Sequence, residues 1–297
     1  MKIAVIIERS APHRKRITHN LASIQRHQIQ TFTSNSEDCK NTVTQALQAL
    51  PDLVMICGGL SLSTCVINLL QDLRLDSKPV LSIHSAGTTN DFCKTYDNGG
   101  VTRTINQFEK GKLYPLDLIK ITGPFKHRYA LNMVTCGLGG NILRSVKNKE
   151  RWLPESLNYH LSIMYWLLKY KSPKLRISVN SMTIKNHLFM AGFGNGKFAG
   201  NGLGICPQAE LGNGSFAVTL IGKIGLFDFF KYYAKLRKAK LISKDPRGVY
   251  TSSHSTELEV LEGEMAIECD GQYFRSFEAG ERLNIHSIPS AFSVVQN

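Results

Sequence analysis

The sequence lacks any apolar run close to the roughly 18 residues that a helix needs to cross a bilayer. It also lacks a signal-peptide pattern, because the apolar run within Met1 to Glu8 is short and no small-residue cleavage site accompanies it. We therefore expect a cytoplasmic protein. The hydrophobic fraction of 42% is large enough for a packed core, and 297 residues suffice for one large domain or two ordinary ones.

Cysteine motifs are missing as well. The seven cysteines include no Cys-x-x-Cys pair and no Cys/His spacing of the kind that binds zinc, and their number is odd. Most of them lie inside apolar runs. These features argue against a disulfide framework and a zinc site, and we expect reduced thiols in or near the core.

Acidic residues are scarce relative to basic ones. The chain has 23 Asp and Glu against 36 Lys and Arg, which gives a formal net charge of +13. Such an excess attracts phosphate-rich partners, namely nucleotides, nucleic acid or an anionic membrane surface. No recognition helix or aromatic platform accompanies the charge, so we expect no nucleic-acid partner.

Continuous apolar runs alternate with amphipathic stretches in the first third of the chain. Residues 3–7, 53–57 and 80–83 have the pattern of fully buried strands, and a stretch with helical spacing follows residue 59. This alternation is typical of a parallel sheet covered on both faces. The sequence therefore predicts a doubly wound α/β domain.

The pattern changes near Leu116. Apolar and polar residues alternate in several later segments, such as 175–179 and 265–269. Alternation repeated this often indicates antiparallel strands with one buried face, in a sandwich or barrel. Two helices are expected to interrupt it, at about 157–170 and 226–240. The predicted fold class is α/β plus all-β, with a C-terminal β-sandwich-like domain.

Two polar loops follow neighbouring strands of the predicted parallel sheet. Gly58-Gly59 ends one strand and opens a helix, and the loop 86–92 follows the next strand. A tight turn explains the first loop and a helix cap the second. At the carboxyl edge of a parallel sheet, however, backbone amides and a helix N-terminus bind phosphate. Two such loops favour a shared polyphosphate site, so we expect them to face each other.

Two further clusters lie in the second part of the chain. Four glycines fall within nine residues in the segment 193–203, more than a hairpin needs, and they permit close backbone approach to a ligand. The segment 268–272 runs from a strand into an Asp-Gly pair, which in isolation indicates a hairpin turn.

With these four clusters in view, the chain resembles the diacylglycerol kinase catalytic-domain family of bacterial lipid kinases, which is related to sphingosine, ceramide and NAD kinases. The loop 86–92, Ala-Gly-Thr-Thr-Asn-Asp-Phe, stands where the family reads AGTGNDF. The Gly-Asn-Gly steps at 194–196 and 200–202 match its GNG and GGG, and Asp270-Gly271 matches its DGE. The resemblance spans nearly the whole chain.

The resemblance implies ATP-dependent transfer of the γ-phosphate to a hydroxyl of a diacylglycerol-like lipid, with Mg²⁺ required. It also implies an α/β nucleotide-binding domain at 1–116, completed by 288–297, and a β-rich lipid-substrate domain at 117–287. The implied site residues are Asp270 and Gln272 for catalysis, Asn213 and Asp117 for metal binding, and Gly58, Gly59, Gly87, Thr88, Thr89, Asn90, Asp91, Asn195 and Gly196 for nucleotide binding.

The chain departs from the family pattern at the positions of the phosphate loop, the general base and the metal ligand. Leu60 and Leu62 stand where the phosphate loop has an Asp and a Thr, and Gln272 stands where a Glu is cast as general base. Asn213 replaces an Asp that holds Mg²⁺, and an uncharged carbonyl oxygen binds Mg²⁺ more weakly. Glu8-Arg9 takes the place of an Asn-Pro phosphate turn.

These departures predict impaired catalysis, because Leu60 and Gln272 cannot accept a proton or bring negative charge to a metal. Glu268 shares a strand face with Asp270 and could supply a carboxylate, although a solvated strand end is the simpler explanation. The alternative function is a catalytically silent regulator that binds nucleotide or lipid.

The predicted helix at 226–240 carries an apolar stripe and many basic residues. The stripe consists of Leu226, Phe229, Phe230, Tyr233 and Leu236. A helix with its apolar face in the core explains this pattern, and so does an interfacial helix on anionic lipid, which would make the protein peripheral at the inner membrane surface. The oligomeric state stays open, a homodimer included.

Overall fold

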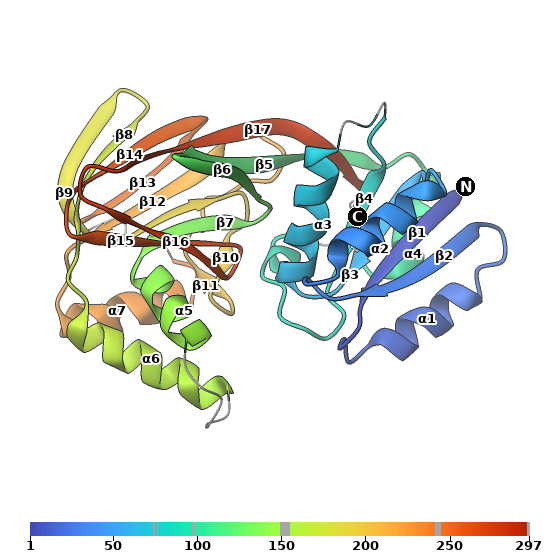
Figure 1. Ribbon diagram of the computed structural model, residues 1–297, viewed down its shortest axis with the longest axis horizontal. Helices are drawn as coiled ribbons and strands as arrows, with labels where there is room; N and C mark the ends of the chain where they lie inside the picture. The colour runs from blue at the N-terminus through green and yellow to red at the C-terminus, as the bar shows by residue number, and fades with distance from the viewer. Residues whose placement is uncertain (74, 76, 97–98, 149–154, 241–244, 296–297) are drawn as a thin grey trace. The chain divides into compact units, whose positions relative to one another are not determined.

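The computed structural model covers residues 1–297 and describes all of them except 74, 76, 97–98, 149–154, 241–244 and 296–297. The chain forms two compact units, whose elements are labelled in Figure 1. Unit 1 contains Met1–Leu118, Leu211–Gly214 and Ile288–Asn297, and unit 2 contains Ile119–Glu210 and Ser215–Ser287.

Unit 1 is built on a parallel sheet with the strand order β2-β1-β3-β4-β17. The strands are Lys2–Glu8 (β1), Gln28–Ser34 (β2), Leu53–Cys57 (β3), Val80–His84 (β4) and Arg282–Val295 (β17). The helices are Arg14–Ala22 (α1), Cys39–Gln48 (α2), Leu60–Asp72 (α3) and Val101–Glu109 (α4), and Phe92–Lys94 forms a 3-10 turn. Strand β17 joins this sheet where Val294 pairs with Leu81 of β4.

The sheet of unit 1 is buried because its central strands carry apolar residues without interruption. All five residues of β3 are buried. On one face, Val5 and Met55 form a core with Leu21 of α1 and Ile105 of α4. Helices α2 and α3 contact each other and cover the other face (Figure 1). The predicted doubly wound α/β domain is confirmed.

Unit 2 consists mainly of antiparallel strands, in the order β16-β15-β7-β9-β8-β14-β17. The remaining strands of the chain are Leu113–Gly123 (β5), Phe125–Ala130 (β6), Met133–Gly137 (β7), Lys174–Val179 (β8), Met182–Gly194 (β9), Phe198–Ala199 (β10), Leu203–Gly204 (β11), Phe216–Gly222 (β12), Gly248–Ser253 (β13), Ser255–Glu262 (β14), Glu264–Cys269 (β15) and Gln272–Glu278 (β16). Alternate residues such as Leu175, Ile177 and Val179 point into one core. The predicted β-sandwich-like domain is confirmed.

In the described part of unit 2, the helices are Leu138–Asn148 (α5), Glu155–Lys169 (α6) and Leu226–Leu236 (α7). Helix α7 ends before the predicted residue 240, because the chain turns and Ala239 adopts a left-handed conformation with φ +48°. No helix in the part of the chain that the structure describes is long and apolar enough to span a membrane.

The cysteines agree with the sequence-based expectation. Five of the seven are buried, Cys65 and Cys93 are half-buried, and no disulfide joins any two of them. Burial raises the pKa of the Cys57 thiol to about 12, and it does the same for Cys93. The expected position of the cysteines in or near the core is therefore confirmed.

Candidate functional site

The two polar loops of unit 1 lie against each other at the carboxyl ends of β3 and β4, which are adjacent and parallel. The Leu60 N–H donates to the carbonyl oxygen of Thr89 over 3.4 Å. The Asn90 side-chain amide donates to the carbonyl oxygen of Gly58 over 3.1 Å. The expected meeting of the loops is confirmed, and their binding of a nucleotide stays a prediction.

The carboxylate of Glu8, the last residue of β1, lies between the two loops. Its Oε2 accepts hydrogen bonds from the Gly59 N–H at 2.9 Å and from the Thr88 hydroxyl at 3.0 Å. Gly58 permits this approach, because a Cβ at that position would come within 2.8 Å of the Glu8 Cβ. Gly87 turns the second loop with φ +90°, a conformation that favours glycine. A carboxylate thus engages an amide and a hydroxyl, which are donor types that also bind phosphate oxygens in proteins.

The N-terminus of α3 makes this position favourable for an anion. Gly59 is the N-cap residue of this 13-residue helix, and a glycine has no side chain that could cap the helix. The first amides and the dipole of a helix attract negative charge. Here Glu8 supplies that charge, while Leu60, the first residue of the helix, contributes a buried apolar side chain. The anion position is therefore filled from within the chain.

Asn90 and Asp91 hold the second loop in shape. Besides its hydrogen bond to the first loop, the Asn90 side-chain amide donates to the Ser63 hydroxyl at 3.4 Å. The Asn90 side-chain oxygen accepts from the Cys93 N–H, also at 3.4 Å. Asp91 is buried, and its carboxylate pairs with the Lys94 ammonium at 2.7 Å. These two predicted nucleotide-binding residues therefore organise the loop, whereas Gly59 and Thr88 carry donors suited to a phosphate.

In unit 2, the Asp270 carboxylate is the centre of a backbone clamp. Asp270 is 2% exposed and lies in the turn between β15 and β16 with φ +52°. Its Oδ2 accepts from the Leu131 N–H at 2.7 Å, and its Oδ1 accepts from the Asn132 and Met133 N–H groups, both at 2.9 Å. The predicted catalytic residue thus uses both oxygens to position the segment that leads into β7.

The predicted glycine cluster contacts the same segment. The N–H groups of Asn195 and Gly196 donate to the Asn132 carbonyl oxygen at 2.9 and 3.0 Å. The Asn195 side-chain amide donates to the Leu131 carbonyl oxygen over 3.2 Å. The structure therefore brings Asn195, Gly196 and Asp270 together around residues 131–133. A nucleotide-binding role for Asn195 and Gly196 stays a prediction.

Two more polar residues flank this clamp. The Gln272 side-chain oxygen accepts from the Arg128 guanidinium at 2.7 Å. The expectation that Glu268 lies at a solvated strand end is wrong, because Glu268 is buried where β15 pairs with β7. Burial raises the pKa of the Cys136 thiol, and the nearby Glu268 carboxylate raises it further. Unit 2 therefore buries a second carboxylate close to the Asp270 turn.

The two predicted metal ligands, Asp117 and Asn213, have different surroundings, and their binding of Mg²⁺ stays a prediction. Asp117 is buried, and its two oxygens accept from the N–H groups of Gly214 and Ser290 at 2.7 and 2.8 Å. Asn213 is exposed. Among the described residues, no three or more His, Cys, Asp or Glu side chains are grouped to hold a metal ion. Asp117 instead ties 211–214, which the sequence-based boundary assigns to the second domain, to unit 1.

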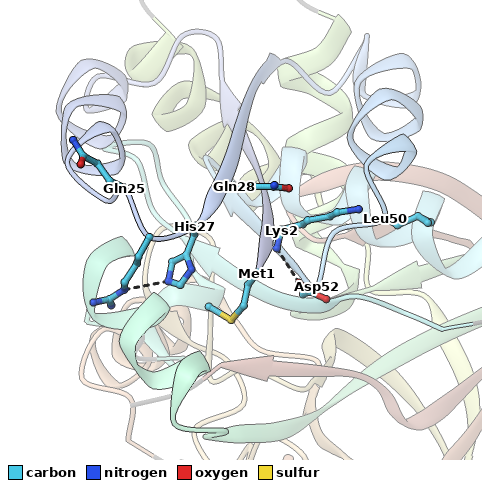
Figure 2. A pocket seen from close by; sticks show the side chains of 8 residues that line it. Met1, Lys2, Gln25, His27, Gln28, Leu50 and Asp52 are labelled. Atoms are coloured by element: carbon cyan, nitrogen blue, oxygen red, sulfur yellow. Dashed lines mark hydrogen bonds between the residues drawn. The ribbon is translucent and has the colours of Figure 1, made fainter.

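A cavity of about 550 Å³ opens at the opposite, amino edge of the unit 1 sheet (Figure 2). Its lining consists of Met1, Lys2, Gln25, Arg26, His27, Gln28, Leu50 and Asp52. The Arg26 guanidinium pairs with the Glu109 carboxylate at 2.8 Å, and His27 contacts the same carboxylate. The cavity contains none of the predicted site residues.

Comparisons with known proteins decide the family. The diacylglycerol kinase catalytic domain matches residues 3–121, and the YegS C-terminal NAD kinase beta sandwich-like domain matches residues 132–296, more than half of the chain. This chain belongs to the diacylglycerol kinase catalytic-domain family. The resemblance inferred from the sequence is thereby confirmed.

Individual relatives of this lipid kinase family agree with the assignment. "Probable lipid kinase YegS-like" of Yersinia pestis (strain Pestoides F) is 26% identical over 185 residues, which span 62% of this chain and 62% of the relative. A crystal structure of a diacylglycerol kinase from Bacillus anthracis strain Sterne superposes with a TM-score of 0.70 at 18% identity, covering 100% of this chain and 97% of that chain. Yeast NADH kinase complexed with NADH gives a TM-score of 0.55 at 11% identity, covering 99% and 82%. At these identities the two structures establish the fold.

Proposed function

We propose that this family member is an ATP-dependent lipid kinase with impaired catalysis, acting on a hydroxyl of a diacylglycerol-like lipid. Family membership supports the reaction class. The Gly59 amide and the Thr88 hydroxyl at the N-terminus of α3 support nucleotide binding, because they are the donor types that bind phosphate in proteins. The contacts of Asp117 give no support for a Mg²⁺ ion held by protein side chains.

The proposal of impaired catalysis rests mainly on the position of the Glu8 carboxylate. Phosphoryl transfer depends on positioning the γ-phosphate and stabilising its negative charge. A nucleotide phosphate that uses Gly59 and Thr88 must first displace Glu8, and the two groups have the same sign of charge. The Leu60 side chain offers no hydrogen bond or charge to compensate. Nucleotide affinity is therefore expected to be weaker than in a relative with an open loop.

The acceptor side of the reaction is weakened independently. A positioned base that takes the proton of an acceptor hydroxyl contributes about 10²–10⁴-fold in rate. Gln272 is an amide bonded to Arg128, and the Asp270 oxygens accept three backbone amides. We expect residual phosphate transfer to depend on Asp270, because its carboxylate positions residues 131–133.

The second candidate is a catalytically silent regulator that binds nucleotide or lipid. It is favoured by the same two features, because a carboxylate at the phosphate loops and an amide in place of the base both weaken turnover without removing the fold. The two candidates differ in one observable, the transfer of phosphate to lipid.

A transfer assay on vesicles tests the proposal. Full-length protein is incubated with Mg²⁺, γ-labelled ATP and vesicles of diacylglycerol in phosphatidylglycerol, as wild type and as Asp270→Asn, with circular dichroism to confirm folding. Slow labelling of lipid that Asp270→Asn abolishes supports the kinase. Nucleotide or lipid binding without labelling identifies the regulator, and rapid labelling that survives Asp270→Asn contradicts the proposed site.

A further inference from the structure

Unit 2 exposes an apolar surface on two helices. Of the fourteen exposed large apolar side chains among the described residues, eight lie on α6 and α7. The eight, called here the apolar helix surface, are Leu161, Met164, Tyr165 and Leu168 on α6 and Leu226, Phe227, Phe230 and Tyr233 on α7. Helices of this kind normally turn such side chains toward a core, so their exposure requires an explanation.

Helix α6 contacts its own unit through the other side. The four exposed residues have the spacing i, i+3, i+4, i+7, which places them in one stripe along the helix, and Leu168 is 69% exposed. Ser162 is fully buried, and the Trp166 indole N–H donates to the Ser145 hydroxyl of α5. Packing therefore uses the Trp166 side and leaves the apolar stripe in solvent.

Helix α7 has two apolar faces rather than one. Tyr232 and Leu236 are buried in a core cluster of unit 2. Leu226, Phe230 and Tyr233 lie on a different side at the spacing i, i+4, i+7 and are exposed. Phe227 beside them is 92% exposed. The stripe read from the sequence combined parts of both faces, so the helix is a core helix on one side and free on the other.

Aromatic contacts connect the two helices. The Phe189 ring of β9 lies 6.0 Å from the Phe229 ring of α7 and 5.7 Å from the ring of Tyr170, which directly follows α6. Both helices also lie on the same side of unit 2 in Figure 1. The two stripes can therefore meet one extended surface together.

Charge indicates what that surface is. Exposed basic residues lie on the two helices or within three residues of their ends in the sequence, namely Lys169, Lys171, Lys223, Lys231, Arg237 and Lys238. The acidic residue of α7, Asp228, is neutralised by Arg247. Apolar side chains flanked by exposed basic residues are typical of helices that lie in the interface of anionic bilayers.

We propose that the apolar helix surface docks unit 2 on an anionic lipid bilayer. The aliphatic and aromatic side chains enter the headgroup region, and the bordering lysines contact lipid phosphates. This surface is where the proposed kinase would meet its membrane, so its biological role rests on the proposed function. Its binding to lipid is a physical property that can be measured without nucleotide or turnover.

Vesicle flotation tests this inference directly. The full-length protein is mixed with vesicles of phosphatidylglycerol and phosphatidylcholine, or of phosphatidylcholine alone, in the absence of ATP. We expect wild type to bind the anionic vesicles. The double variant Phe227→Ser/Phe230→Ser should weaken binding at least about tenfold, because two large side chains no longer enter the interface. The matched control is Leu50→Ser, which removes a side chain that is 79% exposed in unit 1 and should change nothing.

A charge-reversal pair gives the second arm. Lys231→Glu should weaken binding by about fivefold or more, since one basic residue near the surface contributes about 1 kcal/mol. Lys185→Glu makes the same change at an exposed position on β9 and should bind as wild type does.

Three outcomes overturn the inference. Wild-type protein that does not float with anionic vesicles refutes it, and so does equal binding by the wild type and both α7 variants. Dimerisation in solution that Phe227→Ser/Phe230→Ser abolishes, without vesicle binding, would assign the surface to a second copy of the chain. None of these results bears on phosphate transfer, so the proposed reaction is tested separately.

Discussion

Removing the Glu8 carboxylate is expected to strengthen nucleotide binding. In most settings, truncating a hydrogen-bonded side chain weakens a site. Here the side chain engages the Gly59 amide and the Thr88 hydroxyl that a phosphate would use, so Glu8→Ala opens the site. The same change should lower the free energy of unfolding by about 1–3 kcal/mol, because two hydrogen bonds to a charged acceptor are lost.

The size of the gain follows from the charge. When a phosphate takes over the two donors, their hydrogen bonds are exchanged and largely cancel. The remaining cost is the repulsion between the carboxylate and the phosphate, about 1 kcal/mol at 4 Å in water and about 4 kcal/mol at an effective dielectric constant of 20. Glu8 is half-buried, and its carboxylate can swing toward solvent. We therefore expect about 1–2 kcal/mol, or about 5–30-fold in the dissociation constant for ATP.

Titration calorimetry with a non-hydrolysable ATP analogue measures this gain. Glu8→Gln keeps an acceptor but removes the charge, and should recover most of the increase. Glu37→Ala removes an equal charge from an exposed position in unit 1 and serves as the control. If folded Glu8→Ala binds no more tightly than wild type and Glu37→Ala, the carboxylate does not block the site and the reasoning fails.

Three further outcomes follow from the structure. Asp270→Asn should lower the free energy of unfolding by about 2–3 kcal/mol in urea titrations. The two oxygens of Asp270 accept from three backbone N–H groups, and an NH₂ group would replace one of these oxygens. An unchanged urea midpoint would contradict the clamp. Arg247 lowers the pKa of Asp228 and Asp245 through hydrogen bonds, so its stabilising effect is fully present above their ordinary value of 3.8 and is lost progressively as the pH falls toward the lowered values. The melting temperature of Arg247→Leu should accordingly lie below that of wild type at pH 7, and the gap should narrow as the pH falls from about 4 to about 2; a gap as large at pH 2 as at pH 7 would refute this. The Cys57 thiol, whose pKa burial raises to about 12, should react with a thiol reagent at pH 8 only after unfolding, and rapid native labelling would show that it is accessible.

The fold could be read from the sequence where one periodicity dominates. The five residues of β3 are all apolar and all buried, and the alternation in β8 matches its burial residue by residue. Helix α7 shows where this fails. Both of its faces carry large apolar side chains, so spacing alone could not separate buried Tyr232 from exposed Tyr233. Only the position of the helix on the sheet decides which side is covered.

The location of the candidate site was predictable from the sequence, but the position of the Glu8 carboxylate between its two loops was not. Glycines and hydroxyls after two neighbouring strands place the loops together, because parallel strands end at one edge. Nothing local indicates that Glu8 reaches residues 51 and 80 positions away in the chain. The one available signal was the replacement of the family's phosphate turn by Glu8-Arg9. The burial of Glu268 likewise depends on the pairing of β15 with β7, which sequence spacing does not specify.

The most direct test of the central claim is the rate of γ-phosphate transfer from ATP to diacylglycerol in vesicles, compared between wild type and the variant Leu60→Asp/Gln272→Glu. The account predicts slow or undetectable transfer by wild type. It predicts a rise of at least about 10²-fold in the variant, because Gln272→Glu supplies a base at the acceptor side and Leu60→Asp supplies the carboxylate that the family pattern directs at a metal ion. Wild-type turnover at about 1–100 per second, as for typical kinases, with no gain in the variant would contradict it.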